Sequence, residues 1–343
     1  MIRIPHAVRV PALTLAAAVL LSSWTTAFAG NYDDKDFSLR FPAALTRFAT
    51  YGDVAGVGGA SAGSKWSTSV NPASTAWMED PPRKISVSPQ YTRLSFDNGS
   101  VFEVPAQSLS VDAGPAGYFT GSAAQVTTNR EAMSSGLGFR FNANMEQLLW
   151  AKKLSKEWAV GSAFTYSKSL TRLTYGDYQV AKCDSESYAL RGGVLRKITD
   201  QWLAGLVVDY GWSSDRTNMA GMPGRIYDST RQFLVRPGVS YEYMTDGTVY
   251  LDYQYGTFSN DTGLLTVHRI CTGVEHGFTK WLFARAGTTI DPAVGSCSWT
   301  CGLGLYPASW FSLDVGYQND MFPEMSKEFG RSHTLTVSVS FTF

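Results

Sequence analysis

The sequence predicts an all-β protein, a transmembrane antiparallel β-barrel of about 14 strands with an N-terminal hatch, or plug. Three observations predict this fold. The chain begins with an export signal, most of it alternates apolar and polar residues, and short polar turns are each followed by an aromatic residue. The expected organisation is a signal peptide over residues 1–29, a hatch over 30–82 and an outer-membrane barrel over 83–343.

The first 29 residues have the features of a secretory signal peptide. Arg3 and Arg9 precede an apolar run from Pro11 to Leu21, and Ala27-Phe28-Ala29 forms an A-x-A cleavage site. That run is too short for a stable transmembrane helix, and no apolar run of about 18 residues follows it. We therefore expect a mature chain that begins near Gly30 and leaves the cytoplasm. Strands can still span a membrane, because a barrel wall needs apolar residues only at every second position.

Composition narrows the possible partners and chemistry. Without the signal peptide, 27 basic residues face 29 acidic ones, and no basic tract remains, which argues against nucleic acid as a partner. The four cysteines, Cys183, Cys271, Cys297 and Cys301, are too few for a disulfide scaffold. Cys297 and Cys301 would be roughly 13 Å apart on an extended strand, so a disulfide there needs a turn or bulge. Which cysteines pair, if any, stays open.

The C-terminal stretch SHTLTVSVSFTF gives the strongest strand signal. Leu335, Val337 and Val339 lie on one predicted face, and Thr334 and Thr336 lie on the other. The apolar face ends in Phe343, the last residue, which is typical of the assembly signal of outer-membrane barrels. We expect the barrel-assembly machinery to bind this strand.

The same alternation recurs upstream and assigns charged residues to the face opposite the apolar one. A Lys or Arg at the centre of the bilayer costs about 2 to 4 kcal/mol, so these side chains are expected to face a polar lumen. Either they line a polar pore or, as we favour, they form salt bridges that hold the plug. The predicted lumen-facing charges are Arg191, Asp209, Arg236, Glu242, Asp252, Arg269, Glu275, Arg285 and Asp314.

Short turns such as KLSKEW, KITDQW and GFTKW recur between the predicted strands. The aromatic residue after each turn indicates an interfacial girdle, because amphipathic rings favour the headgroup level of a membrane. The predicted periplasmic girdle is Trp158, Trp202, Tyr250, Trp281 and Trp310. The alternate connections, near 172–183, 215–228 and 321–331, are read as longer polar loops on the outer side. Residues 112–142 alternate poorly, so 12 strands is the alternative count.

The stretch RFATYGDVAGVGGASAGSKWSTSVNPASTAWM is similar to the N-terminal hatch of FadL-type outer-membrane transporters of hydrophobic compounds. In that family a glycine-rich run, here Val54 to Ala60, leads to an Asn-Pro-Ala motif, here Asn71-Pro72-Ala73. The resemblance implies a 14-stranded barrel in the bacterial outer membrane. It assigns the movable hatch to Gly56, Gly58, Gly59, Asn71, Pro72 and Ala73.

The resemblance further implies transport of long-chain fatty acids or aromatic hydrocarbons by hatch rearrangement and a lateral opening beside a kinked third strand. Gly121 is the expected position of that kink, and a simple bulge is the alternative. The implied partners are outer-membrane lipids and a hydrophobic small-molecule ligand, with no cofactor or metal, and the chain is expected to be a monomer.

Two other classes of function remain. The chain is shorter than the well-studied transporters and lacks an obvious pair of long apolar loops, which favours as the alternative a general diffusion channel or a structural, docking barrel of a surface-assembly system. An enzyme is not expected. His268, His276 and His333 fall on the apolar outward face, and no serine elbow, metal cluster or phosphate loop is present.

Overall fold

The computed structural model describes residues 32, 35–47, 55–57, 59–60, 62–64, 69–77, 85–128, 131–292 and 295–343. The predicted signal peptide over residues 1–29 and the predicted hatch residue Gly58 lie outside the described residues. Among the described residues, no helix is both long enough and apolar enough to cross a membrane.

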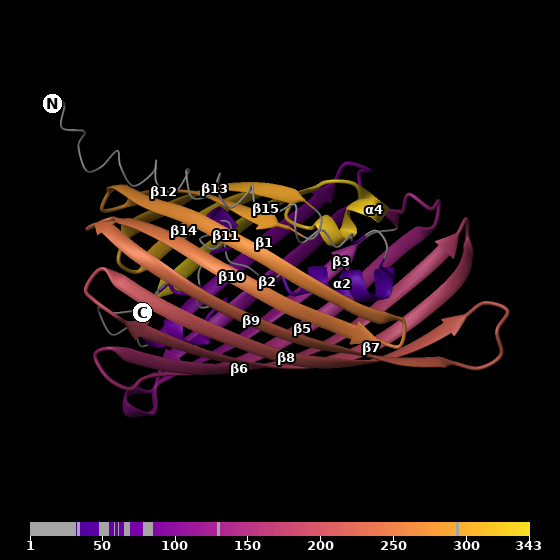
Figure 1. The fold of residues 1–343 in the computed structure, drawn as a ribbon, viewed down its shortest axis with the longest axis horizontal. Coiled ribbons are helices and arrows are strands. Elements are labelled where there is room, and N and C mark those ends of the chain that lie inside the picture. Colours follow the sequence, from indigo (N-terminus) through magenta and orange to yellow (C-terminus); the bar gives the residue numbers. More distant parts are fainter. Residues whose placement is uncertain are drawn as a thin grey trace.

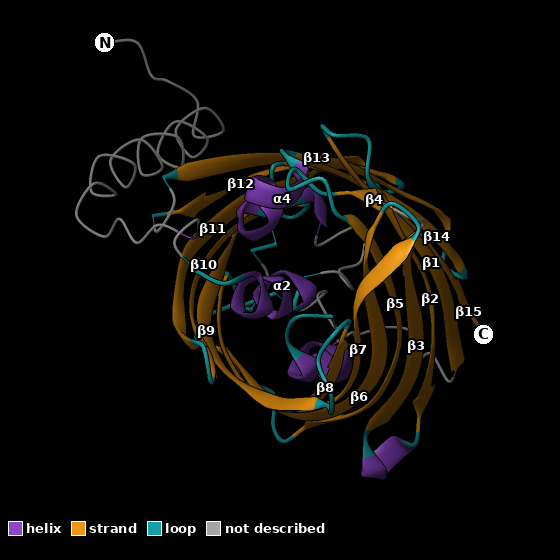
Figure 2. Ribbon diagram, turned by 90° about the vertical axis from the view of Figure 1, so that its right-hand side faces the viewer, coloured by secondary structure: helices purple, strands orange, loops and turns teal. Residues whose placement is uncertain are grey.

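Fourteen strands form a closed antiparallel barrel (Figures 1 and 2). The wall closes because β1 pairs with the last strand, β15, and β3 pairs with β5. A further strand of two residues, β4 (Glu131–Ala132), pairs only with β5. The prediction of about 14 strands is confirmed, and the alternative count of 12 is wrong. The wall strands are β1 (Ile85–Phe96), β2 (Val101–Asp112), β3 (Tyr118–Thr128), β5 (Gly138–Lys153), β6 (Trp158–Tyr175), β7 (Tyr178–Lys197), β8 (Trp202–Met219), β9 (Ile226–Met244), β10 (Gly247–Asn260), β11 (Gly263–Thr279), β12 (Leu282–Asp291), β13 (Ser296–Ala308), β14 (Phe311–Asn319) and β15 (Ser332–Thr342).

The wall is much taller on one side than on the other. Strands β6 to β9 contain 18, 20, 18 and 19 residues, whereas β12 contains 10 and β14 contains 9. The predicted loops at 172–183 and 215–228 are therefore wrong. They are mostly paired strand, because backbone hydrogen bonds hold a ladder together outside a membrane even where both faces are polar. These hairpins extend beyond the rest of the barrel at its right-hand end (Figure 1).

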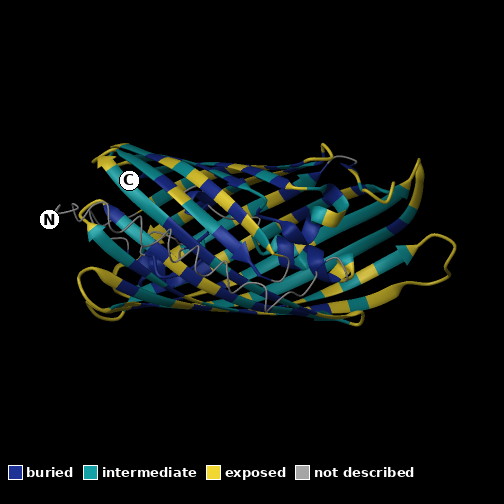
Figure 3. Cartoon of the chain, turned by 45° about the horizontal axis from the view of Figure 1, so that its top comes forward, coloured by how far each residue is buried: buried dark blue, intermediate teal, exposed yellow. Residues whose placement is uncertain are grey.

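The last strand shows how the two faces of the wall differ. Thr334, Thr336 and Ser338 are buried, whereas Leu335 is 45% exposed and Phe343 is 74% exposed. The hydroxyl face therefore points into the barrel and the apolar face points outward. Buried and exposed residues alternate along many of the strands (Figure 3). An apolar outer face on a closed wall is what a membrane-spanning barrel requires.

Part of the wall reverses this pattern. On β1, β2 and β5, the side chains of Leu94, Phe102 and Phe141 are buried in one cluster with Phe41 and Phe329. These inward apolar residues were not predicted, because the expectation of a polar lumen was applied to every strand. They are inward because two helices at this end of the lumen, α2 (Phe37–Leu45) and α4 (Ser326–Phe329), need an apolar surface to pack against.

The described parts of residues 30–82 lie inside the ring of strands, where α2 and the 3-10 helix η3 (Pro72–Trp77) are visible in an end-on view (Figure 2). Asp36 caps α2, since its Oδ1 accepts a hydrogen bond from the Ser38 backbone N–H at 2.8 Å. The predicted outer loop at 321–331 also turns inward, and it carries a short 3-10 helix, η5 (Pro323–Met325), followed by α4.

Candidate functional site: the lumen and its N-terminal segment

The Asn-Pro-Ala motif lies at the start of η3, against the inner wall. Asn71 is fully buried, and its Nδ2 donates to the carbonyls of Ala62 at 2.7 Å and Val194, on β7, at 3.1 Å. Its Oδ1 accepts a hydrogen bond from the Ala73 backbone N–H at 3.0 Å. One side chain thus caps η3, joins it to the glycine-rich stretch and joins both to the wall, which an Asn can do because its amide is both donor and acceptor.

Two wall glycines permit this close approach. A Cβ added at Gly193 would lie 2.2 Å from Asn71 Oδ1 and 2.7 Å from Pro72 Cδ. A Cβ added at Gly161 would lie 2.6 Å from the Ala73 nitrogen. No side chain fits at either position, so the inner wall is shaped to receive the motif.

Three of the predicted lumen arginines link the wall to itself and to the N-terminal segment. Arg191 pairs with Asp209 at 2.8 Å and donates to the Ser69 carbonyl at 2.8 Å. Arg236 pairs with Asp252 at 3.1 Å and donates to the Gly59 carbonyl. The Asp252 carboxylate also accepts a hydrogen bond from the Ala62 backbone N–H at 2.7 Å.

The third arginine, Arg285, pairs with Glu275 at 2.5 Å and with Asp314 at 2.6 Å. Its side chain also packs against Gly56, where an added Cβ would lie 3.1 Å from Arg285 Cβ. The Gly56 carbonyl accepts a hydrogen bond from Thr300 at 3.0 Å. Gly59 has a φ of +74°, a left-handed conformation that glycine adopts without strain.

The remaining predicted charges also lie on the inner face. Arg269 is discussed below, and Glu242 lies two residues after Ser240, whose hydroxyl donates inward to the Gly63 carbonyl at 2.9 Å. The nine charges therefore share the lumenal side, and eight of them take part in ion pairs.

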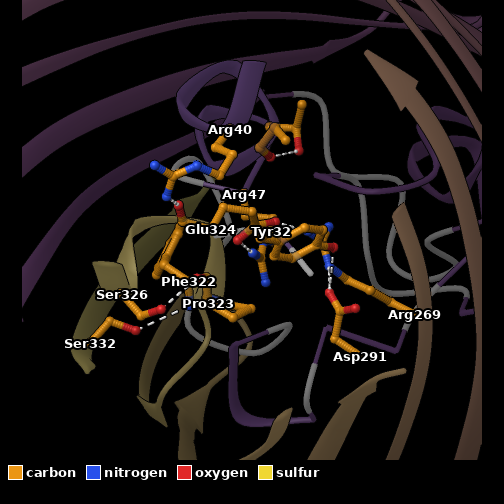
Figure 4. A network of polar contacts seen from close by, with 12 residues as sticks. Tyr32, Arg40, Arg47, Arg269, Asp291, Phe322, Pro323, Glu324, Ser326 and Ser332 are labelled. Atoms are coloured by element: carbon orange, nitrogen blue, oxygen red, sulfur yellow. Dashed lines mark hydrogen bonds and ion pairs between the residues drawn. The ribbon is translucent and has the colours of Figure 1, made fainter. Parts of the chain in front are cut away.

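A second ionic network lies at the α2 end of the lumen and was not predicted apart from Arg269 (Figure 4). Arg269, which is 1% exposed, pairs with Asp291 at 3.2 Å and with the fully buried Glu324. Glu324 also pairs with Arg47, and the Tyr32 hydroxyl donates to Asp291 at 2.8 Å. Removing one partner of such a buried pair lowers the free energy of unfolding by about 3–5 kcal/mol. The network therefore contributes strongly to holding three separate chain segments together.

Arg40 adds the helix α2 to this network. It is 2% exposed, pairs with Glu328 at 2.5 Å and donates to the Glu324 carbonyl at 2.7 Å. No periodic signal in the sequence predicts these contacts, because Arg40, Glu324 and Glu328 lie outside the alternating strands. The feature that sets this connection apart from an ordinary polar outer loop is its apolar residues, such as Phe322 and Phe329, which are buried.

A cavity of about 610 Å³ lies between α2 and the tall side of the wall. Its lining includes the apolar side chains of Phe37, Phe41, Leu45, Phe141, Met145 and Leu173. Hydroxyl groups lie among and beside them, from Ser167, Ser169, Thr171, Ser185, Ser187 and Ser213. Arg191 and Ser69 also reach this cavity, which therefore borders the N-terminal segment.

Two predicted positions differ from expectation. β3 pairs continuously with β5 from Tyr118 to Thr127, so at Gly121 there is neither a kink in the ladder nor a bulge. Gly121 forms an ordinary pair with Leu148, because a glycine also adopts the extended conformation. The nearest interruption is in the pairing of β2 with β3 around Pro105, which has no N–H to donate.

The predicted girdle also needs one correction. Trp158, Trp202, Trp281 and Trp310 are 38–55% exposed. Tyr250, in contrast, is 4% exposed and packs in the lumen against Val57, Ala60 and Cys271. Tyr250 shares the inward parity of Asp252 and Gln254 on β10, and the rule based on the turns ignored that parity.

The cysteines and histidines do not form a reactive cluster. All four cysteines are free thiols; Cys271 is buried, Cys297 and Cys301 are exposed, and Cys183 lines the cavity. The three histidines lie on the outer side of the wall, and each is hydrogen-bonded to a tyrosine at 2.7–3.0 Å. Among the residues that the structure describes, no group of His, Cys, Asp or Glu is arranged to hold a metal ion.

Comparison with known proteins gives a match in structure alone. No protein-family model matches the chain, and no curated sequence matches it. The Ralstonia pickettii toluene transporter TbuX matches with a TM-score of 0.57 at 12% identity, over 80% of this chain and 92% of that one. A Pseudomonas aeruginosa FadL homologue matches with a TM-score of 0.54 at 12% identity, over 86% and 98%.

The Pseudomonas putida toluene transporter TodX matches with a TM-score of 0.50 at 10% identity, over 79% and 91%. Two of these neighbours are named as toluene transporters and the third as a FadL homologue. At such low identity the likeness concerns the fold, and it agrees with the closed wall and apolar outer face described above. The chain has the fold of FadL-type transporters.

Proposed function

We propose that this protein passes small hydrophobic molecules, such as long-chain fatty acids or aromatic hydrocarbons, across the outer membrane. The cavity of about 610 Å³ beside α2 is the observation that carries the proposal. Its volume lies within the range of about 300–1,000 Å³ of small-molecule sites. Its apolar side chains, such as those of Phe37, Phe41 and Met145, would bury a hydrocarbon.

The lining also favours a particular kind of substrate. Burial of apolar surface provides about 25 cal/mol per Å², so the phenylalanines of the lining would supply most of the affinity. The serine and threonine hydroxyls of the lining would accept or donate one or two hydrogen bonds. An amphipathic molecule with one small polar group therefore fits this cavity better than a wholly apolar one.

In this proposal residues 30–82 act as the hatch. Asn71, Gly56 and Gly59 are joined to the wall through polar contacts with Val194, Thr300 and Arg236. Polar contacts can be exchanged for contacts with water at small net cost, about 0.5–1.5 kcal/mol per hydrogen bond. A segment held in this way can move without unfolding the barrel.

The lumen charges favour a hatch over a polar diffusion channel. Arg191, Arg236 and Arg285 each form an ion pair with a neighbouring strand and also touch the N-terminal segment. Charges that satisfy one another leave little field for passing ions, whereas a selective polar pore depends on rings of charge that face the ion.

The test is planar-bilayer conductance of the full-length protein beside a variant that lacks residues 30–70. We expect the full-length protein to be nearly silent and the deletion variant to conduct steadily, because the barrel strands begin at Ile85 and remain intact. A steady open pore in the full-length protein would show that the lumen is not plugged and would favour a diffusion channel. Equal silence in both proteins would favour a docking barrel.

Ligand binding is tested separately through Cys183, which lines the cavity. In a background in which Cys271, Cys297 and Cys301 are replaced by serine, a bound fatty acid or toluene should slow modification of Cys183 by a small maleimide several-fold. The matched control restores Cys297, on the outer face, in place of Cys183. Protection of Cys297 to the same degree would mean that the ligand acts through the detergent micelle and not through the cavity.

A further inference from the structure

The tall side of the wall carries a second aromatic belt on its outer face. Tyr166, Tyr188 and Trp212 are neighbours across β6, β7 and β8, with ring centroids 5.3 Å and 5.4 Å apart. Trp202 and Trp212 are ten residues apart on β8. At about 3.3 Å per residue and a tilt of about 40°, this separation spans about 25 Å, the height of the apolar band of an outer-membrane barrel. Trp212 therefore marks the outer surface of the membrane.

Directly beyond this belt, the outer face of the same strands becomes basic. The cross-strand register places Asp184 opposite Arg216 two rows above the aromatic residues, and Arg172 opposite Lys182 three rows above them. Here the wall forms a hollow of about 210 Å³, to which the exposed connection between β8 and β9 adds Arg225. We call this feature the basic hollow; its cations are Lys168, Lys182, Arg216 and Arg225.

The cations of the hollow exceed its acids. Asp184 and Glu186 are the acidic residues of its lining, and they pair with Lys182 at 3.1 Å and Lys168 at 3.4 Å. Both pairs are exposed to solvent, and exposed ion pairs are weak. For Arg216 and Arg225 the described residues provide no ion pair within 4.0 Å. Two guanidinium groups are thus available for an anion at the height of the lipid headgroups.

We propose that the basic hollow binds the phosphorylated headgroup of an outer-leaflet glycolipid, lipopolysaccharide. Planar guanidinium groups bind phosphate oxygens through paired hydrogen bonds, and a cluster of basic residues beside a membrane attracts anionic headgroups. The hydroxyl of Ser214 and the amide of Asn218 also line the hollow and suit a sugar ring.

The surface below the hollow fits the rest of such a lipid. Phe164, Leu190 and Tyr210 are 40–54% exposed on the outer face, one row below the aromatic belt. Acyl chains that descend from a headgroup in the hollow would lie along this surface. A soluble phosphorylated molecule would gain nothing from it, so the membrane lipid is the occupant that the geometry favours. The inference does not depend on what the lumen transports.

The test compares lipid binding by the full-length protein and by a variant with Lys182→Gln, Arg216→Gln and Arg225→Gln. None of the three residues faces the lumen. The probe is purified lipopolysaccharide, added to the detergent-solubilised protein and followed by native mass spectrometry. We expect binding to weaken at least about tenfold, because each of the three basic residues beside an anionic membrane contributes to the attraction.

The matched control carries the same kind of change at three exposed arginines elsewhere, Arg93→Gln, Arg196→Gln and Arg331→Gln. It should bind lipopolysaccharide like the unmodified protein. Equal binding by both triple variants would overturn the proposal, as would equal binding of lipopolysaccharide from which the phosphates have been removed. Full competition by inorganic phosphate would show a free-anion site instead of a lipid site. The heat-modifiable gel shift of a folded barrel confirms that each variant is folded.

Discussion

At the scale of single residues, the contact between the N-terminal segment and the wall depends on wall positions that carry no side chain. Gly193 faces the lumen, and any Cβ there would occupy the place of Asn71 Oδ1. Gly192, the next residue, has nothing within 4 Å of an added Cβ. Because side chains alternate across a strand, a methyl group added at Gly193 points into the lumen and one added at Gly192 points outward. Comparing the two variants therefore separates an effect on the lumen from an effect on the strand itself.

We therefore predict opposite outcomes for the two alanine variants. Gly193→Ala should displace the Asn-Pro-Ala motif, since overpacking of this kind costs about 1–3 kcal/mol, and the barrel should begin to conduct in planar bilayers. Gly192→Ala should behave like the unmodified protein in the same measurement. If both variants stay silent and equally stable to heat, the motif does not close the lumen.

At the scale of elements, the sequence predicts the strands, whose alternating pattern repeats, and misses structural features that occur only once in the chain. The strands of the wall are found from their alternation, and each predicted lumen charge has inward parity, since a period of two sets the direction of every side chain. The strands that carry the inward phenylalanines, such as Phe102 and Phe141, also alternate, but there the apolar residues face the lumen. Alternation reveals a strand, but which face is the lumen depends on what fills the lumen nearby.

The connections show the same limit. The stretch 172–183 was predicted as a polar loop, yet it forms a hairpin that closes at residues 176–177. The stretch 321–331 was predicted as an outer loop and instead turns into the lumen, where Glu324 meets Arg269 and Arg47. Such ion pairs join residues that are far apart in the chain, so no local sequence pattern predicts them.

At the scale of the whole molecule, the N-terminal segment lies inside the wall, and the two parts are held by different kinds of contact. The wall is held by continuous backbone ladders, and the N-terminal segment is held within it by side-chain hydrogen bonds, ion pairs and small apolar clusters. The wall is therefore expected to be the more rigid part, and in the proposed function the segment is the part that moves against it. The proposed transport requires that movement.

A reversible lock tests this requirement. Val70, in the N-terminal segment, and Val207, on β8, are buried in one cluster with Ala62, so Val70→Cys with Val207→Cys should form a disulfide under oxidising conditions. With the native cysteines replaced by serine, the oxidised protein should lose uptake of a labelled fatty acid in proteoliposomes, and a reductant should restore it. Each single-cysteine variant is a control, and its uptake of the fatty acid should be the same with and without the reductant. Uptake at the unmodified rate by a fully cross-linked protein, verified by its gel mobility, would mean that the substrate passes without movement of the segment near Val70.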